Sequence, residues 1–170
     1  MTECIIVSDS HYNEEILKHL IEQYPSLPIY HCGDSELPDT SIVFQHIKTV
    51  AGNCDFESEV KPLERVEQLA DIVFFITHGH RYKLKSSYYP IEMAGKERAA
   101  DIVLFGHSHV PFVDYDKEQK ILLINPGSIE QPRIFPPQKT YVHLKITPNT
   151  YYVTYLNEKD EILKNLTFQR

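Results

Sequence analysis

The chain has 170 residues, of which 42% are hydrophobic and 24% are charged, a composition that fits a folded domain with a core of ordinary size and excludes a disordered chain. Its 17 basic and 24 acidic residues give a formal net charge of −7, and no cluster of Lys and Arg stands out, so a nucleic-acid-binding patch is not expected. The chain has neither an apolar run of the roughly 18 residues that cross a bilayer nor an N-terminal signal-peptide pattern, so we expect no membrane segment and a cytoplasmic location.

Strands and helices alternate in the first half of the predicted structure. A short buried strand is expected over 4–8. Asn13 can cap a helix that carries acidic residues in its first turn and that Pro25 ends. Another helix is expected from about Pro90 to Ala100. Further strands are predicted over 28–32, 46–51, 72–77 and 102–105, of which the last two are continuous apolar runs typical of strands covered on both faces.

Antiparallel hairpins dominate the prediction for the second half. Residues 110–115 and 120–125 flank a polar turn, and two further strands are expected over 140–146 and 150–156. Because β-α-β units come first and hairpins follow, we predict an α/β (α+β) fold in which two sheets pack together with helices outside. No repeat or linker is visible, so 1–170 is treated as a single domain.

Each of five predicted strands ends in carboxylate, amide or imidazole side chains. The carboxyl ends of strands border the ligand crevice in open α/β sheets, so side chains at those positions can converge. Any one of these motifs alone is more readily explained as a turn or a cap, but imidazoles are not favoured turn residues, and five successive strand ends are hard to explain in that way. The residues expected to converge are Asp9, His11, Asp34, Asn53, His78, His107 and His109.

These seven side chains predict a site for two divalent metal ions. Residues i and i+2 of extended backbone point to the same side, so Asp9 and His11, like His107 and His109, can aim two groups into one site. Oxygen and nitrogen ligands without thiolate favour Mn²⁺, with Zn²⁺, Fe and Ni²⁺ as alternatives. Seven ligands exceed the needs of one tetrahedral ion, whereas two ions joined by a bridging carboxylate use them all.

In order along the chain, the motifs are Asp-x-His, Gly-Asp, Gly-Asn-x-Asp, His-Gly-His, Gly-His-x-His and Asn-Pro-Gly-Ser. This pattern resembles the calcineurin-like metallophosphoesterases, and in particular the small YfcE-like phosphodiesterases. The resemblance runs from Asp9 to about Arg133. It implies a four-layer α-β-β-α sandwich with two mixed sheets and the site at one edge.

The resemblance also implies how the ligands divide between the ions. Asp34 would bridge the two ions. One ion would be held by Asp9, His11 and His109, and the other by Asn53, His78 and His107. The implied reaction is hydrolysis of a small phosphodiester by a hydroxide that bridges the ions, since metal binding lowers the pKa of water from 15.7 to about 7 in favourable cases.

Four further residues are candidates for a role in catalysis or substrate binding. Many larger relatives have a His after the Asn, thought to protonate the leaving group, and this chain has Cys54 there. His80 is therefore the preferred catalytic acid, with orientation of a ligand as its alternative role. Besides Asn53, the residues expected to contact substrate are Ser128, with a plain turn as its alternative, and Arg133, with a surface charge as its alternative.

Two other functions are weighed against the phosphodiesterase. One is a non-catalytic scaffold for protein interactions, because relatives of this fold include a retromer subunit that serves as a binding platform and has an impaired metal site. The intact ligand set of this chain favours the enzyme. The other is a phosphomonoesterase, which the absence of the His at position 54 disfavours. A homo-oligomer is left open.

Overall fold

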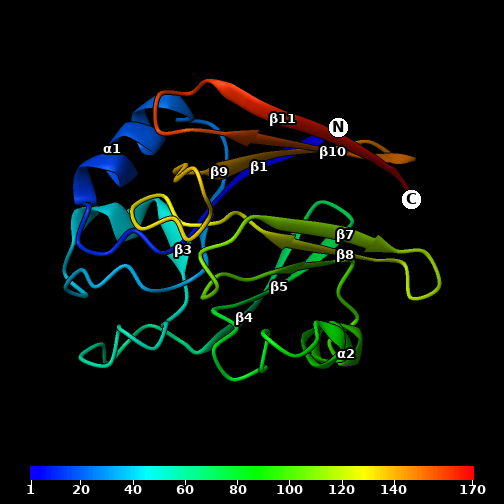
Figure 1. Cartoon of the computed structure of the whole chain (residues 1–170), viewed down its shortest axis with the longest axis horizontal. Coiled ribbons are helices and arrows are strands. Elements are labelled where there is room, and N and C mark those ends of the chain that lie inside the picture. Colours follow the sequence, from blue (N-terminus) through cyan, green and yellow to red (C-terminus); the bar gives the residue numbers. More distant parts are fainter.

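Two β-sheets packed face to face form the body of the structure, a computed structural model that describes residues 1–170 (Figure 1). The six-stranded sheet has the order β11-β10-β9-β1-β2-β3, and the five-stranded sheet has the order β4-β5-β6-β8-β7. The strands are β1 (Thr2–Val7), β2 (Ile29–His31), β3 (Ile47–Thr49), β4 (Glu64–Leu69), β5 (Ile72–Thr77), β6 (Ile102–Leu104), β7 (Phe112–Asp116), β8 (Ile121–Asn125), β9 (Tyr141–Ile146), β10 (Thr150–Leu156) and β11 (Ile162–Gln169).

Parallel and antiparallel pairs occur in both sheets. β1, β2 and β3 run parallel, while β9 lies antiparallel to β1 and leads into the antiparallel strands β10 and β11. The hairpin predicted for 110–125 is confirmed as β7 and β8, but β8 also pairs in parallel with β6. The C-terminal strands therefore complete the sheet that the N-terminal strands begin. β4 and β11 were not predicted, because their sequences lack a continuous apolar run.

Helices cover the outer face of each sheet. Helix α1 (Glu14–Gln23) begins where predicted, and its cap Asn13 accepts a hydrogen bond of 3.1 Å from the backbone N–H of Ile16. It packs on the six-stranded sheet beside the short 3₁₀ helix η1 (Ile42–Gln45). Helix α2 (Tyr89–Glu97) packs on the five-stranded sheet. The four layers confirm the predicted α-β-β-α sandwich. No helix is long and apolar enough to cross a membrane.

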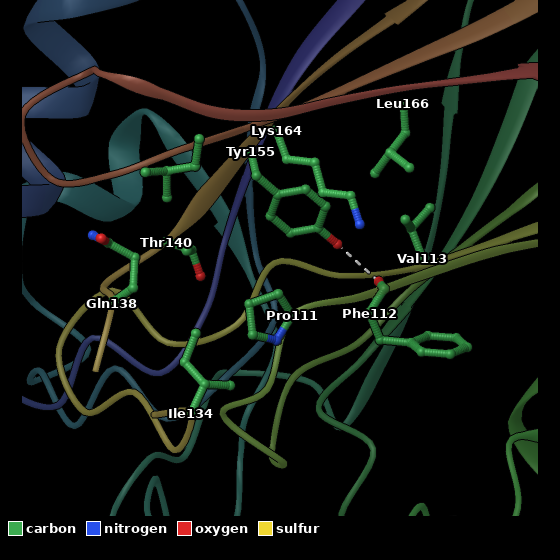
Figure 2. Close-up of a pocket in the computed structure, with 10 residues that line it drawn as sticks. Pro111, Phe112, Val113, Ile134, Gln138, Thr140, Tyr155, Lys164 and Leu166 are labelled. Atoms are coloured by element: carbon green, nitrogen blue, oxygen red, sulfur yellow. Dashed lines mark hydrogen bonds between the residues drawn. The ribbon is translucent and has the colours of Figure 1, made fainter. Parts of the chain in front are cut away.

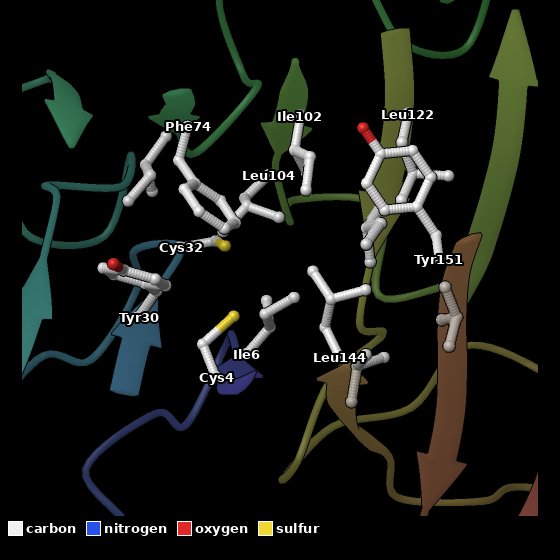
Figure 3. Close-up of a cluster of buried hydrophobic side chains, with 14 of the residues drawn as sticks. Cys4, Ile6, Tyr30, Cys32, Phe74, Ile102, Leu104, Leu122, Leu144 and Tyr151 are labelled. Carbon is white, nitrogen blue, oxygen red and sulfur yellow. The ribbon is translucent and has the colours of Figure 1, made fainter. Parts of the chain in front are cut away.

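The largest apolar core lies between the two sheets. Side chains of β1, β9 and β10 meet side chains of β5, β6 and β8 there, and Figure 3 shows Ile6 and Leu144 of one sheet among Phe74, Leu104 and Leu122 of the other. All five are fully buried. This contact holds the two sheets in one fixed relation, which brings the carboxyl ends of their parallel strands to a common edge.

The close approach of α2 to β6 depends on Gly95. A Cβ at this position would overlap a methyl group of Val103. Because Val103 is fully buried and both elements are regular, the extra atom cannot be accommodated without moving the helix.

We predict that Gly95→Ala destabilises the protein by about 1–3 kcal/mol, even though alanine favours helix over glycine by about 1 kcal/mol. Thermal and urea unfolding would measure the change. Lys96→Ala, at the neighbouring exposed position, is the control and should change stability by less than about 0.5 kcal/mol. A stabilised Gly95→Ala variant would show that the helix has room to move outward.

Candidate metal centre

The seven predicted ligands follow five strands that belong to both sheets. Asp9 and His11 follow β1, Asp34 follows β2, and Asn53 follows β3 in the six-stranded sheet. His78 follows β5, and the His107 and His109 pair follows β6 in the five-stranded sheet. Backbone hydrogen bonds join these loops, including Asp9 N–H to Gly33 O at 3.0 Å and Gly106 N–H to His78 O at 3.0 Å. The structure thus brings all the predicted ligands to one edge of the sandwich.

Five of the seven ligands have left-handed backbone conformations. The φ angles are 55° at Asp9, 38° at His11, 56° at Asp34, 65° at His107 and 59° at His109. Asp and His adopt this region more readily than most residues, but it still costs energy, and such residues concentrate at functional sites. The surrounding hydrogen bonds therefore hold the ligands in positions that extended strands would not give them.

One group of ligands consists of Asp9, His11 and His109. His109 Nε2 lies 3.0 Å from Asp9 Oδ1 and 3.3 Å from His11 Nε2. The other ring nitrogen of each histidine is already used: Nδ1 of His109 donates to Gln131 O at 2.6 Å, and Nδ1 of His11 donates to Glu36 Oε2 at 2.6 Å. The Nε2 atoms therefore present lone pairs to the carboxylate.

The second group is built in the same way around His78. Its Nδ1 donates to Cys32 O at 2.7 Å, so Nε2 presents a lone pair 3.2 Å from Asp34 Oδ2 and 3.2 Å from Asn53 Oδ1. His107 Nδ1 is 2.9 Å from the same Asn53 oxygen. Asp9 Oδ1 lies 3.9 Å from His78 Nε2, so the two groups adjoin at this carboxylate atom.

The arrangement fits divalent cations. Asp9 Oδ1 is buried and has no hydrogen-bond partner, an arrangement that costs free energy unless a cation compensates it. While the histidines are neutral, acceptors face acceptors at about 3 Å in both groups, a contact that is repulsive unless a proton or a metal cation lies between them. Nitrogen and oxygen donors without a thiolate suit Mn²⁺ or Zn²⁺.

The electrostatics of the site depend on the same contacts. Burial opposes the charged form of His78, but the Asp34 and Asp9 carboxylates outweigh burial and raise its pKa. Burial also opposes ionisation of Asp34, yet His78 and the Cys54 backbone N–H hold the pKa of Asp34 well below its usual range. Asp34 is therefore a carboxylate at neutral pH. The pKa of Cys54 is raised to about 12 by burial and by Asp34, so its thiol stays protonated.

Two supporting residues were missed from the sequence as parts of the site. Glu36 fixes the ring of His11, as described above. Asp55 is buried, and its carboxylate accepts hydrogen bonds from the backbone N–H groups of Asp34 (2.7 Å), Gly52 (2.8 Å) and Glu36 (2.8 Å). Asp55 belongs to the quoted Gly-Asn-x-Asp motif, which could have drawn attention to it. Nothing in the sequence alone pairs Glu36 with His11.

The remaining candidates are distributed around the ligands. Arg133 lines a cleft of about 270 Å³ together with Asp34, Asn53 and three of the histidines. Ser128 is fully buried, and its hydroxyl donates to Asp9 O at 2.8 Å, so it lies behind the ligands rather than on the surface of this cleft. The ring centroid of His80 lies 5.4 Å from that of His78, and His80 Nδ1 is buried without a partner.

The other four histidines lie outside the ligand groups. His31 is buried, accepts a hydrogen bond from Gly33 N–H through Nδ1 and contacts Ser10 Oγ through Nε2. His46 is exposed. His19 and His143 pair with Asp160 and Glu3.

An apolar groove elsewhere on the molecule takes no part in this site. It has a volume of about 490 Å³, lies between β7 and β11, and is lined by side chains that include Phe112, Ile134 and Leu166 (Figure 2). Tyr155 contributes its ring and donates its hydroxyl hydrogen to Phe112 O at 2.9 Å. None of the predicted metal ligands lines it.

The fold and this ligand arrangement agree with comparisons to known proteins. The sequence profile of the calcineurin-like phosphoesterase superfamily domain matches residues 3–149, and the chain belongs to this metal-dependent family. It is 34% identical over 132 residues to a probable metallophosphoesterase of Bacillus subtilis, covering 76% of each chain. It is 25% identical over 142 residues to a phosphodiesterase of Methanocaldococcus jannaschii, covering 72% of this chain and 81% of that protein.

Solved structures give the same assignment. A predicted phosphoesterase from Streptococcus pneumoniae superposes with a TM-score of 0.94 at 31% identity, covering 99% of this chain and 98% of that one. Vacuolar protein sorting protein 29 from Cryptosporidium parvum superposes with a TM-score of 0.74 at 14% identity, covering 99% and 98% of the chains. This second likeness concerns the fold alone.

We predict that Mn²⁺ raises the melting temperature of the metal-stripped protein, because a cation relieves the repulsion around Asp9 Oδ1. At 100 times its Kd, a bound ion adds about 2.7 kcal/mol, or about 5–10 °C for a chain of this size. Asp9→Asn should lose most of this increase, whereas His143→Gln, which alters a histidine–carboxylate pair outside the site, should keep it. An equal increase in Asp9→Asn would place the ion elsewhere.

Proposed function

We propose that the chain is a dinuclear metal-dependent phosphodiesterase and that residues 1–170 act as one domain. The observation that carries the proposal is the set of acceptor atoms that face one another in two adjoining groups, with Asp9 Oδ1 at their junction. Two cations at this edge would satisfy every one of these atoms. A purely structural role would not require two adjoining groups of unpaired lone pairs in a site that opens to solvent.

The proposed division of ligands follows the two groups. Asp9, His11 and His109 would hold one ion, and Asn53, His78 and His107 the other. Asp34 would be shared between them, since a carboxylate oxygen of Asp34 lies within 4.8 Å of ligand atoms of both Asp9 and His78, and Mn²⁺ is the proposed ion. Such ions, when bound, supply an activated water nucleophile and offset charge on the phosphoryl oxygens.

The side chains of this protein do the remaining work of orientation. Glu36 and the carbonyls of Cys32 and Gln131 keep three imidazoles turned with Nε2 towards the site. Arg133 lines the cleft and is exposed, so its guanidinium can donate hydrogen bonds to a phosphoryl oxygen. Asn53 is exposed at the same cleft, so its amide is also placed to contact the substrate.

The charges at the cleft favour a diester over a monoester. Asp34 and Glu36 line it beside Arg133, which is its only Lys or Arg side chain. A phosphomonoester carries up to two negative charges at neutral pH and a diester one, and besides the proposed ions the cleft offers only Arg133 to offset the additional charge. One of the relatives is itself named a phosphodiesterase, which supports the same choice.

A non-catalytic scaffold is the alternative, because a vacuolar sorting protein has a similar fold. The hydrogen bonds that orient three of the four imidazoles favour the enzyme. A scaffold would have no need to keep three Nε2 lone pairs directed at two carboxylates.

We further propose His80 as the group that protonates the leaving group. It lies beside His78 and His107, with ring centroids 5.4 and 6.1 Å away, and only part of its surface is covered. Its Nδ1 has no partner within the protein. The ring is therefore free of structural hydrogen bonds at that atom and adjoins the second ligand group.

Metal-stripped protein supplied with Mn²⁺ should hydrolyse bis(p-nitrophenyl) phosphate faster than p-nitrophenyl phosphate.

Asp34→Asn should lower kcat/KM more than His11→Gln does, because Asp34 would contact both ions. The loss in Asp34→Asn should exceed the roughly 10–100-fold loss typical of removing an outer partner of a metal ligand. A milder loss in Asp34→Asn than in His11→Gln, at equal metal content, would overturn the shared role. Absence of hydrolysis with Mn²⁺, Zn²⁺, Ni²⁺ and Mg²⁺ alike would favour the scaffold.

For His80→Gln, we expect kcat/KM to fall about 10²–10⁴-fold for alkyl esters and much less for p-nitrophenyl esters, whose leaving group needs no proton. The measurement is log kcat/KM against leaving-group pKa for a series of diesters. His19→Gln, at an exposed histidine paired with Asp160, is the matched control. Parallel lines for wild type and His80→Gln would assign proton donation to another group.

A further inference from the structure

A second cleft of about 430 Å³ opens beside the metal ligands. It shares Glu36 and Cys54 with the cleft that contains the ligands, so the two adjoin. Two aromatic side chains line it, Tyr12 and Phe56, and they are 70% and 81% exposed. Large aromatic side chains that border a cleft next to a reaction centre offer flat faces on which a ring can stack.

Hydrogen bonds between two loops make this cleft a fixed feature. Asp39 accepts hydrogen bonds from Ser58 Oγ at 2.6 Å and from Glu59 N–H at 3.0 Å. Lys61 Nζ donates to Leu37 O at 2.8 Å. The loop that follows β2 and the loop that follows β3 are therefore tied together along the floor. Phe56 lies in the loop after β3, and Tyr12 lies in the loop after β1, where its backbone N–H donates to Ser35 O at 2.9 Å. Both aromatic side chains are exposed although these loops are well bonded.

The charge presented to a ligand in this cleft is negative. Glu36, Asp39 and Glu57 line it. The only basic residue that lines it is Lys61, whose side chain is 3% exposed and lies 3.4 Å from Asp55 and 3.7 Å from Asp39. The ammonium group is thus occupied by the buried carboxylate of Asp55 and the partly exposed carboxylate of Asp39. A second phosphate would be repelled here, whereas an uncharged ring would not.

We propose that this cleft binds one ester arm of the substrate and that this arm is an uncharged, ring-bearing group of the nucleoside class. The inference rests on the proposed phosphodiesterase function. A scissile phosphate at the metal ligands, with a nucleoside directed past Glu36 and Cys54, places the base between the loops that carry Tyr12 and Phe56. The substrate class is a nucleoside phosphodiester without a further phosphate on the arm that enters the cleft.

The test compares two esters that share one leaving group. Thymidine 5′-(p-nitrophenyl phosphate) carries the nucleoside arm, and methyl p-nitrophenyl phosphate lacks it. With Mn²⁺ present, wild type should favour the nucleoside ester in kcat/KM by about tenfold or more, the usual scale of one stacked base. Phe56→Ala should reduce this ratio towards one. Tyr89→Ala is the matched control, because it removes an aromatic side chain on α2 that is 65% exposed. It should leave the ratio as it is in wild type.

A binding measurement separates this inference from the function on which it rests. Titration of free thymidine into the metal-free, ¹⁵N-labelled protein should shift the amide signals of Tyr12 and residues 54–58, and Phe56→Ala should abolish these shifts. If neither ester is hydrolysed but the shifts occur, the proposed function is wrong and the assignment of the cleft as a nucleoside site is supported. If both esters are hydrolysed at equal rates and no shifts occur, the proposed function stands and the cleft assignment is overturned.

Repulsion of a second phosphate by the acidic side chains of the cleft can be tested separately. A 3′-phosphate on the thymidine ester should lower kcat/KM in wild type. Glu57→Lys should raise kcat/KM for this phosphorylated ester by roughly threefold or more, because a repulsive side chain becomes an attractive one. Glu97→Lys makes the same change of net charge on α2 and should recover nothing. Equal recovery in both variants, or none in Glu57→Lys, would show that the walls of the cleft do not select against phosphate.

Discussion

The burial of one carboxylate governs the arrangement of this protein's site. Asp9 is fully buried at the junction of the two sheets. Its Oδ2 accepts hydrogen bonds from Ser8 Oγ at 2.6 Å and His107 N–H at 3.2 Å. Its Oδ1 lies near the histidines and has no hydrogen-bond partner. A buried anion of this kind is stable only beside a cation. The backbone around Asp9 directs Oδ1, the atom without a hydrogen-bond partner, towards the site.

Close approach of the two sheets makes this arrangement possible. Gly106, which follows β6 of the five-stranded sheet, lies against Ser8 and Asp9, which follow β1 of the other sheet. A Cβ at Gly106 would overlap the Ser8 hydroxyl. Ser128, from the loop after β8, donates to the carbonyl of Asp9 and accepts hydrogen bonds from Glu130 and Gln131 N–H. The carbonyl of Gln131 in turn orients His109, so one buried hydroxyl supports ligands from both sheets.

The same buried contacts connect the chemistry to the selection of substrate. Asp55 receives hydrogen bonds from Gly52 and Asp34 on the side of the metal ligands, and from Glu36 on the side of the aromatic cleft. Lys61 neutralises part of its charge without reaching solvent. The ligands sit at strand ends, where the backbone is rigid, and the cleft is made by the loops that continue from β1, β2 and β3. Changes in those loops can alter the ester arm that fits while the ligand groups stay in place.

The sequence by itself determined most of the strands, the polar ends of five of them and the class of chemistry, whereas β4 and β11 were not predicted from it. A strand such as 72–77 is a local apolar run, and His78 directly follows it, so both can be recognised without knowledge of the rest of the chain. The tertiary structure alone decided which strands are neighbours. β9 lies beside β1, and β8 lies between β6 and β7, because the two sheets must bury their apolar faces against each other.

The tertiary structure alone also decided which residues form hydrogen bonds with the metal ligands. Glu36 contacts His11 across 25 residues, and Ser128 contacts Asp9 across 119, although neither pair has a spacing that marks it in the sequence. The cleft lined by Tyr12 and Phe56 likewise forms where the loops after β1, β2 and β3 meet, and the last two are tied together through Asp39 and Ser58. Hydrophobic periodicity and strand ends are local properties that a sequence displays directly. The hydrogen bonds that orient a site depend on distances between remote segments, and those distances are set by the packing of the whole fold.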